Sequence, residues 1–156
     1  MIETRNTQQV QCLIRILETI VRVQPPITPN AQLLRGVMAG NLDAVQRLLQ
    51  DKSVDPNTKD ENGTPALTLA VMNTTVPMNT QLEIVKSLLQ KEGVDVEAKD
   101  KDGETAAVWA VWIRSLPILR ELRNHGARVD TTDRNGDSLL TLAQTNGFDE
   151  IVADLT

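Results

Sequence analysis

The chain has 156 residues, the length of one compact domain, and its 40% hydrophobic and 24% charged residues are typical of a soluble folded protein. Its net charge of -5 argues against a nucleic-acid partner, because binding to phosphate backbones depends on clustered Lys and Arg. With two Trp, one Phe and no Tyr, the core must be built from Leu, Val, Ile and Ala, which favours packed helices over a β-sandwich.

Residues 7–24 are predicted to form a helix that ends before the Pro25-Pro26 break. Apolar side chains recur along it at helical spacing and leave only a narrow polar face: Val10, Leu13, Ile14, Leu17, Ile20 and Val21. We expect an N-terminal capping helix that covers the first helices of the domain that follows, because terminal units of a helical stack need cover. The alternative is that its surplus apolar surface pairs with a second copy, as a homodimer, or with a partner's helix.

Cys12 in this helix is the only cysteine, so no intramolecular disulfide can form, and we expect a cytoplasmic location, with the nucleus as the alternative. We interpret its side chain as part of the core. The apolar stretch around it contains charged residues, is too short to span a bilayer and lacks a signal-peptide cleavage site. We therefore expect neither a targeting peptide nor a membrane partner.

The remainder of the chain contains an internal repeat. The pattern Asp-x-x-Gly followed by a helix-like run begins at Asp60, Asp100 and Asp133. The interval from Gly103 to Gly136 is 33 residues, and that from Gly63 to Gly103 is 40. Between these segments lie amphipathic runs, each followed by a turn: AVQRLLQ before SVDPNTKD, EIVKSLLQ before GVDVEAKD, and ILRELRN before ARVDTTD. The sequence therefore predicts units of two helices joined by turns.

The longer interval is explained by insertions of about seven residues, one after Leu89 and the others at 74–79. We expect Pro77 in this insertion to stop the preceding helix, since proline removes a backbone donor. Thr80-x-x-Glu83, before an apolar run, has the form of a capping box and predicts the start of the next helix.

This pattern resembles the ankyrin repeat, which has a period of about 33 residues and the signature T-P-L-H-x-A. The resemblance covers residues 30–156. Its small-residue position holds alanine three times, and the G-A-D-V-N turn has counterparts at 93–96 and 126–130: Ala70, Ala110, Ala143, GVDV and GARVD. The signature itself departs from the family, because Thr64-Pro65 lies one place early and the histidine position holds Thr68, Val108 and Thr141.

The resemblance implies an all-α fold: an ankyrin-type helix-turn-helix repeat solenoid with short β-hairpin-like fingers and the N-terminal capping helix. We divide the chain into an N-terminal helix with a Pro-rich linker at 1–29 and a repeat domain at 30–156, with units at 30–60, 61–100, 101–133 and 134–156. Asn30 is expected to cap the first helix of the domain. The last unit ends in IVADLT, which suits either a natural cap or a piece of a longer protein.

No catalytic or metal-binding constellation is recognised. His125 is the only histidine, which excludes multi-histidine metal sites. Its Asn-His-Gly context suits a turn, and we expect a structural role and no histidine-based nucleophile triad, since a general base also needs a nearby nucleophile and a cleft. Asp100-Lys101-Asp102-Gly103 resembles the start of a calcium loop, but the later ligands are missing. We therefore expect a protein that is not an enzyme and has no cofactor.

Binding surfaces are implied by the resemblance, since ankyrin-like modules bind proteins through a concave groove and hairpin fingertips. On the groove-facing position of the first helices lie Met38, Met72, Trp112 and Thr145. The fingertip positions hold Glu61, Asn62, Thr64, Lys101, Asp102, Glu104, Arg134, Asn135 and Asp137. Met and Trp are enriched where proteins bind partners. Trp112 is either exposed in the groove or covered by the insertion at 74–79, whereas Trp109 is expected to be interior.

The predicted function is a protein-protein interaction module with an unidentified protein partner. Two alternatives remain from the sequence: an inhibitor or regulator of an enzyme or transcription factor, and the targeting domain of a longer protein such as an effector. Fold alone does not distinguish between them.

Overall fold

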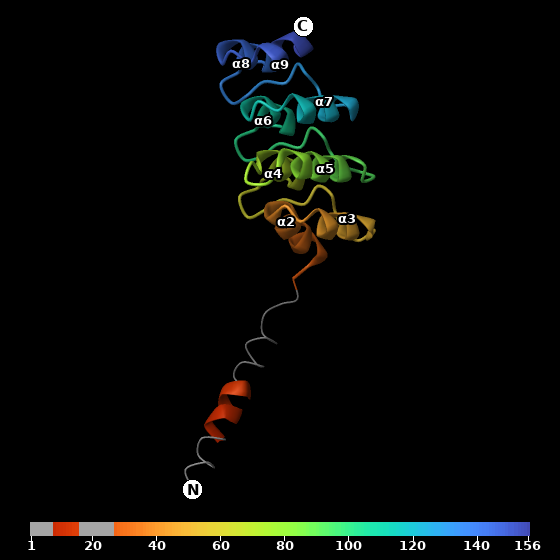
Figure 1. The fold of residues 1–156 in the computed structure, drawn as a ribbon, viewed down its shortest axis with the longest axis vertical. Helices are drawn as coiled ribbons and strands as arrows, with labels where there is room; N and C mark the ends of the chain where they lie inside the picture. Colours follow the sequence, from red (N-terminus) through yellow and green to blue (C-terminus); the bar gives the residue numbers. More distant parts are fainter. Residues whose placement is uncertain (1–7, 16–26) are drawn as a thin grey trace.

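The structure is a computed structural model that describes residues 8–15 and 27–156. From residue 27 onward it consists of helices that pair in chain order and stack into an elongated solenoid (Figure 1). The pairs are α2 (Pro29–Ala39) with α3 (Leu42–Gln50), α4 (Ala66–Met72) with α5 (Met78–Leu89), α6 (Ala106–Trp112) with α7 (Leu116–Asn124), and α8 (Leu139–Thr145) with α9 (Asp149–Leu155). Within the described residues, β-structure is limited to isolated bridges, Lys59 with Pro65 and Thr132 with Ser138.

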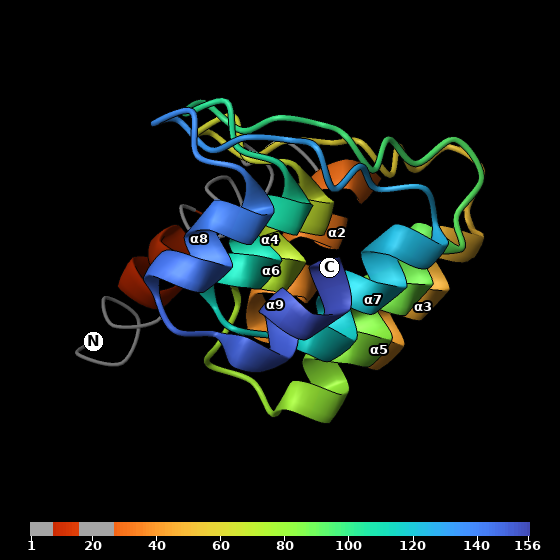
Figure 2. The same ribbon diagram turned by 90° about the horizontal axis from the view of Figure 1, so that it is seen from above.

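The helices form two rows, which Figure 2 shows along the axis of the stack. The first helix of each pair belongs to the row that we call the inner helices: α2, α4, α6 and α8. Each inner helix contacts the next one, and the outer helices α3, α5 and α7 do the same. The connections between pairs extend to one side as the predicted fingers (Figure 2). The all-α repeat architecture predicted from the sequence is therefore confirmed.

The core lies between the two rows. The repeated alanines Ala70, Ala110 and Ala143 are 2%, 0% and 0% exposed, and their small side chains allow close approach of neighbouring inner helices. Larger aliphatic residues fill the space against the outer helices: Leu33, Ile84, Leu88, Ile118, Leu122, Leu139 and Ile151. Burial of such side chains stabilises each by about 1.5–3 kcal/mol relative to exposure. The small-residue position inferred from the repeat is thus a packing position.

Each finger turns at its Asp-x-x-Gly motif. Asp60 Oδ1 accepts hydrogen bonds from the backbone N–H groups of Asn62 at 2.9 Å and Thr64 at 2.8 Å. Gly63 has a φ of 78°, which disfavours any side chain. The same arrangement recurs at Asp100 and Asp133. The aspartate and the glycine are therefore required together by the geometry of the turn, as the sequence pattern predicts.

The first helix starts earlier than expected. Thr28, not Asn30, is its N-cap, and Thr28 Oγ1 accepts from the Ala31 N–H at 3.2 Å. Pro29 occupies the first helical position, where its fixed φ favours helix initiation one residue before Asn30. Asn30 Oδ1 instead accepts from the Asp55 N–H at 2.9 Å, so it holds the finger that follows α3.

The helix boundaries at the insertion also differ from the prediction. Pro77 precedes the first residue of α5 and does not end α4, and Thr80 lies inside α5, so the predicted capping box is wrong. The side chain of Gln81, from α5, binds carbonyl oxygens at the end of α4: its Nε2 donates to Ala70 O at 3.3 Å and to Val71 O. Gln81 is only 2% exposed, so the insertion is fixed at this buried amide.

The N-terminal helix is described at residues 8–15, all of which are exposed. Val10, Leu13 and Ile14 are 47%, 59% and 40% exposed and do not join the core. The capping role predicted for this helix is therefore wrong for its described part, and so is the core position of Cys12, which is exposed. None of residues 8–15 is among those packed against the core that includes Leu33 and Val37. The other residues of the predicted helix lie outside the described ranges.

Candidate protein-binding surface

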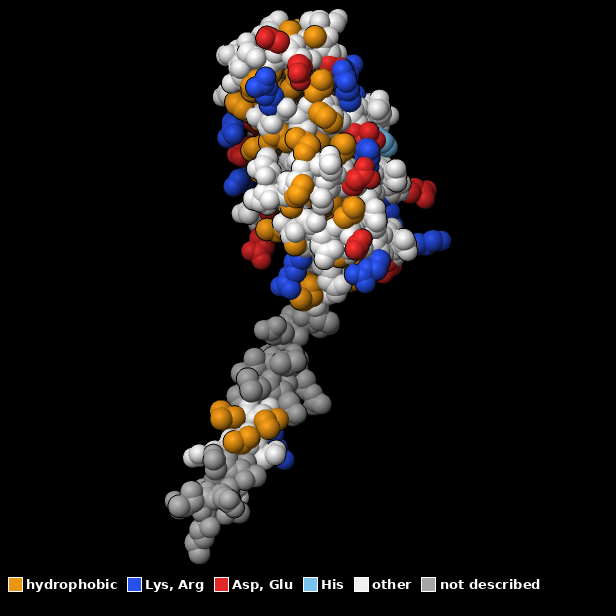
Figure 3. Space-filling model, viewed as in Figure 1, with side chains coloured by type: hydrophobic (Ala, Val, Ile, Leu, Met, Phe, Trp, Pro, Cys, Tyr) orange, Lys and Arg blue, Asp and Glu red, His pale blue; other side chains and the backbone are white. Residues whose placement is uncertain are grey.

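Exposed apolar side chains line up along the C-terminal ends of successive inner helices. Met38 on α2, Met72 on α4 and Trp112 on α6 are 60%, 36% and 40% exposed, and we call these three residues the apolar row. Because α2 contacts α4 and α4 contacts α6, equivalent positions on these helices are neighbours along the stack. Thr145 ends the series on α8. Figure 3 shows that hydrophobic side chains gather in a column along one face of the stack.

Met78 is a further exposed apolar residue that the repeat pattern does not reveal. It is the first residue of α5 and is 47% exposed, and its sulfur accepts a hydrogen bond from Ser115 Oγ at 3.6 Å. Ser115 follows the turn after Trp112, so Met78 connects the insertion to the end of α6. It lies within the insertion at 74–79, where the family pattern has no equivalent position, and sequence reasoning therefore missed it.

The insertion leaves Trp112 exposed and packs on the first helix pair. Asn73 Nδ2, just before the insertion, donates to the carbonyl oxygens of Val37 and Met38, each at 3.0 Å. Val76 lies so close to Gly40 that a Cβ on this glycine would be 2.1 Å from Val76 Cγ1. Of the two arrangements considered for Trp112, the structure has the exposed one. The insertion thus borders the apolar row without covering its tryptophan.

Arginines lie near both ends of the apolar row. Arg35 is three residues before Met38 on α2, which places both on one side of that helix. Arg114 follows α6, and its guanidinium lies 5.5 Å from the centroid of the Phe148 ring. Within the described ranges, neither arginine has an ion-pair partner. The residues of α2, α4, α6 and α8 include no Asp or Glu, so the inner helices themselves place no carboxylate beside these arginines.

Most predicted fingertip residues are exposed: Glu61, Asn62, Lys101, Asp102, Arg134, Asn135 and Asp137. The predicted fingertip contact at Glu104 is wrong, because this residue is 0% exposed and cannot contact a partner. Its Oε1 accepts from the Arg134 backbone N–H at 3.3 Å and lies 3.1 Å from Arg134 Nε. Thr64 is also buried, at 8% exposed. Thr64 and Glu104 each directly follow the glycine of their finger, whereas Asp137 at the equivalent position of the third finger is exposed.

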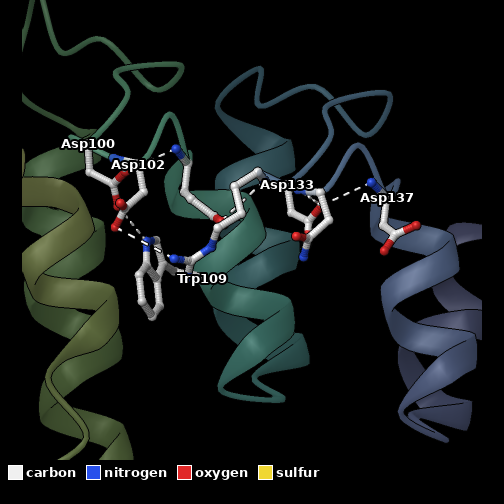
Figure 4. A network of polar contacts seen from close by, with 8 residues as sticks. Asp100, Asp102, Trp109, Asp133 and Asp137 are labelled. Atoms are coloured by element: carbon white, nitrogen blue, oxygen red, sulfur yellow. Dashed lines mark hydrogen bonds and ion pairs between the residues drawn. The ribbon is translucent and has the colours of Figure 1, made fainter.

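A polar network joins the second and third fingers (Figure 4). Asp100 Oδ2 accepts a hydrogen bond of 2.8 Å from Trp109 Nε1, which fixes the half-buried indole to the finger. Trp109 is packed against the core, as predicted, and Trp112 is the exposed tryptophan. The carboxylates of Asp100 and Asp133 accept hydrogen bonds from their own fingers and, at Asp100, from Trp109. Among the residues described, no three His, Cys, Asp or Glu side chains are grouped so as to hold a metal ion.

Hydrogen bonds lower the pKa of finger aspartates. Burial raises the pKa of Asp133, but the backbone N–H groups of Asp137 and Asn135 outweigh this effect and hold the pKa below its ordinary value. The pKa of Asp60 is lowered in the same way, with burial opposed by hydrogen bonds from Thr64 and Asn62. Both carboxylates are therefore ionised acceptors at neutral pH, as their role in the turns requires.

His125 lies at the C-terminal end of α7. Its Nδ1 is 3.0 Å from the carbonyl oxygen of Glu121 and 3.6 Å from Glu121 Oε1. Both contacts are within one helical turn, and the backbone N–H of His125 also bonds to that turn. The histidine therefore contributes to the end of the helix, in agreement with the turn role that its sequence context suggests.

The helix pairs of this chain stack in an inner and an outer row and are joined by fingers. This arrangement defines a helical repeat protein. The family model described as ankyrin repeats (3 copies) matches residues 33–133 and also residues 75–156. The chain belongs to the ankyrin repeat family, which confirms the resemblance drawn from its turns and alanines. Members of this family are generally protein-protein interaction modules. A comparison with curated proteins finds no match. In the part of the chain that is described, no helix is long and apolar enough to cross a membrane.

Proposed function

We propose that this domain is a non-catalytic module that binds a protein partner through the apolar row and the exposed fingertips. The observation that carries the proposal is the alignment of Met38, Met72 and Trp112 on successive inner helices, each at least 36% exposed. Solubility alone does not favour three large apolar side chains in register. Trp and Met are also residue types that contribute strongly at protein interfaces.

The fingertips supply the polar rim of the proposed interface. Their exposed residues mix both signs of charge, which is typical of the rim that surrounds an apolar centre. Glu104 is removed from the proposed contact set because it is buried. The proposed organisation is an N-terminal helix with a Pro-rich linker at 1–29 and a repeat domain at 30–156, and the proposed location is cytoplasmic or nuclear.

Photo-crosslinking in the source cell tests the proposed surface. A photoreactive amino acid replaces Met72 in the row, and in a matched control it replaces Val129, an exposed valine outside the row that is 42% exposed. We expect a protein adduct from position 72 that is absent from position 129. Equal adducts from both positions, or none from position 72, would contradict the proposal. If the partner's own activity changes when this domain is added, the module acts as a regulator.

The exposed N-terminal helix provides a second proposed contact, with another copy of this chain. Val10, Leu13 and Ile14 form an apolar face without cover from the core. Sedimentation of the full chain over a range of concentrations tests this contact, with Leu13→Glu as the variant. Self-association that is lost in the variant supports it, and a monomer at all concentrations contradicts it.

A further inference from the structure

We propose that the apolar row receives an acidic amphipathic α-helix of the partner protein, lying along the axis of the stack. This inference rests on the proposed function of the row and adds the chemistry of the ligand. It follows from the spacing of the apolar residues and from the charges beside them.

The spacing of the row matches an α-helix. Packed helices lie about 8–10 Å apart, so equivalent residues on α2, α4 and α6 recur at about that interval along the stack. In an α-helix with a rise of 1.5 Å per residue, positions i and i+7 are about 10.5 Å apart and lie close to the same face. A partner helix with apolar residues at i, i+7 and i+14 therefore meets Met38, Met72 and Trp112 in turn.

An extended strand does not match the same spacing. Its rise of about 3.3 Å per residue places residues three apart at about 10 Å, but these residues point to opposite faces because side chains alternate. Residues two or four apart share a face at about 7 or 13 Å, and neither distance agrees with the interval between stacked helices. The row therefore favours a helical ligand over a strand.

The charges beside the row select the sign of the partner. Arg35 lies near one end of the apolar row, beside Met38, and Arg114 lies past the other end, after Trp112. The inner helices α2, α4 and α6 contribute no acidic residue between these two arginines. Carboxylates on the partner, placed beside its apolar face near each end, complement these arginines. Phe148 holds the Arg114 side chain in place through its ring, so this cation is positioned before the partner arrives.

The chain's own N-terminal helix fits this site less well than an acidic helix does. Its described residues 8–15 have a suitable apolar face but contain Arg15 and no acidic residue. The described residues of this segment therefore offer no carboxylate to Arg35 and Arg114 when a second copy docks. We therefore assign the row to a different protein, and row-dependent self-association is an outcome that contradicts this assignment.

Designed peptides test the register and the charge. The first peptide is a stable helix of about 21 residues, with leucine at three positions spaced by seven and glutamate beside that face. The second has the same composition with the leucines moved to i, i+5 and i+10, and the third has lysine in place of glutamate. Binding of each labelled peptide to the full chain is measured by fluorescence anisotropy. We expect the first peptide to bind at least about tenfold more tightly than either control.

Protein variants identify the surface that the peptide uses. Trp112→Ala is expected to weaken binding of the first peptide at least about tenfold. The double variant Arg35→Glu with Arg114→Glu is expected to reverse the preference toward the lysine peptide. Arg47→Glu, at an exposed arginine on α3, leaves the preference unchanged and is the control. Equal binding of the first two peptides, no binding of any peptide, or an unchanged charge preference in the double variant overturns the inference.

The two proposals fail in different ways. If the peptides show no dependence on register or charge while position 72 still crosslinks to a protein, the helical ligand is wrong and the protein-binding function stands. If position 72 gives no adduct and the peptides do not bind, both are wrong. If the protein self-associates through the apolar row and Leu13→Glu abolishes this association, the ligand of the row is the N-terminal helix of a second copy and not a helix of another protein.

Discussion

Trp109 Nε1 donates a hydrogen bond of 2.8 Å to Asp100 Oδ2, and this contact ties an inner helix to the finger that precedes it. The neighbouring Trp112 has no such bond and is 40% exposed. Two tryptophans three residues apart therefore have different roles, one in the stability of the fold and one on the surface proposed to bind. This separation makes the pair a useful source of matched variants.

Replacement of Trp109 by phenylalanine removes the indole donor and keeps most of the apolar volume. We expect the free energy of unfolding to fall by about 1–2 kcal/mol, because the bond has a charged acceptor and is partly buried. Partner binding should not change. Urea denaturation followed by circular dichroism measures the first effect. A variant as stable as the wild type would show that the bond does not contribute to stability.

The buried Glu104 is predicted to depend on Arg134. Arg134→Ala leaves the carboxylate buried without its cation, and we expect a loss of about 2–4 kcal/mol in the free energy of unfolding. The second change Glu104→Gln removes the uncompensated charge and should restore at least about 1 kcal/mol. If the double variant is no more stable than Arg134→Ala, the ion pair is not the reason for the loss.

Gly40 is expected to tolerate alanine less well than Gly63 does. Its φ of 65° is strained for alanine, and the added Cβ also meets Val76, whereas Gly63 has a φ of 78° and no atom within 4 Å of its Cβ position. Both alanine variants incur the backbone strain, but Gly40→Ala should lose about 1–3 kcal/mol more. Adding Val76→Ala should recover part of this difference. Equal losses at Gly40 and Gly63 would mean that the insertion does not press on the first pair.

Acid is expected to destabilise the fingers. The folded pKa of Asp133 is lowered below its ordinary value of about 3.9, so its charged form stabilises the fold above that value. This contribution decreases as the pH falls from about 5 through the ordinary value, and it is lost below the folded pKa. Asp133→Asn keeps an oxygen acceptor but does not titrate. Its urea midpoint should therefore fall less steeply between pH 6 and 3 than that of the wild type, and parallel pH profiles would contradict this explanation.

The regular features of the fold could be predicted because the chain repeats them. Asp133 and Gly136 with their counterparts mark the fingers, and Ala110 and its counterparts mark the contacts between inner helices. The features that could not be predicted depend on contacts between distant residues. Thr80 has a good local capping signal, but Gln81 binds the end of α4 and the helix starts earlier at Met78.

The candidate site was predictable in part for the same reason. The apolar row follows from counting equivalent positions along the repeats, and its exposure agrees with that count. Glu104 occupies a fingertip position in the repeat pattern but is buried, because its side chain bonds to Arg134 of the next unit. Sequence spacing alone does not indicate this contact. Met78 lies in an insertion that has no equivalent in the repeat, so only its spatial contact with Ser115 places it beside the row.

The most direct test of the central claim compares the affinity of the crosslinked partner for three forms of this protein: wild type, Trp112→Ala and the control Val129→Ala. Isothermal titration calorimetry gives each dissociation constant, and circular dichroism verifies that the variants are folded. We predict that Trp112→Ala weakens binding by about 2 kcal/mol or more, roughly 30-fold, while Val129→Ala has little effect. An unchanged affinity for folded Trp112→Ala would contradict the assignment of the apolar row as the binding surface.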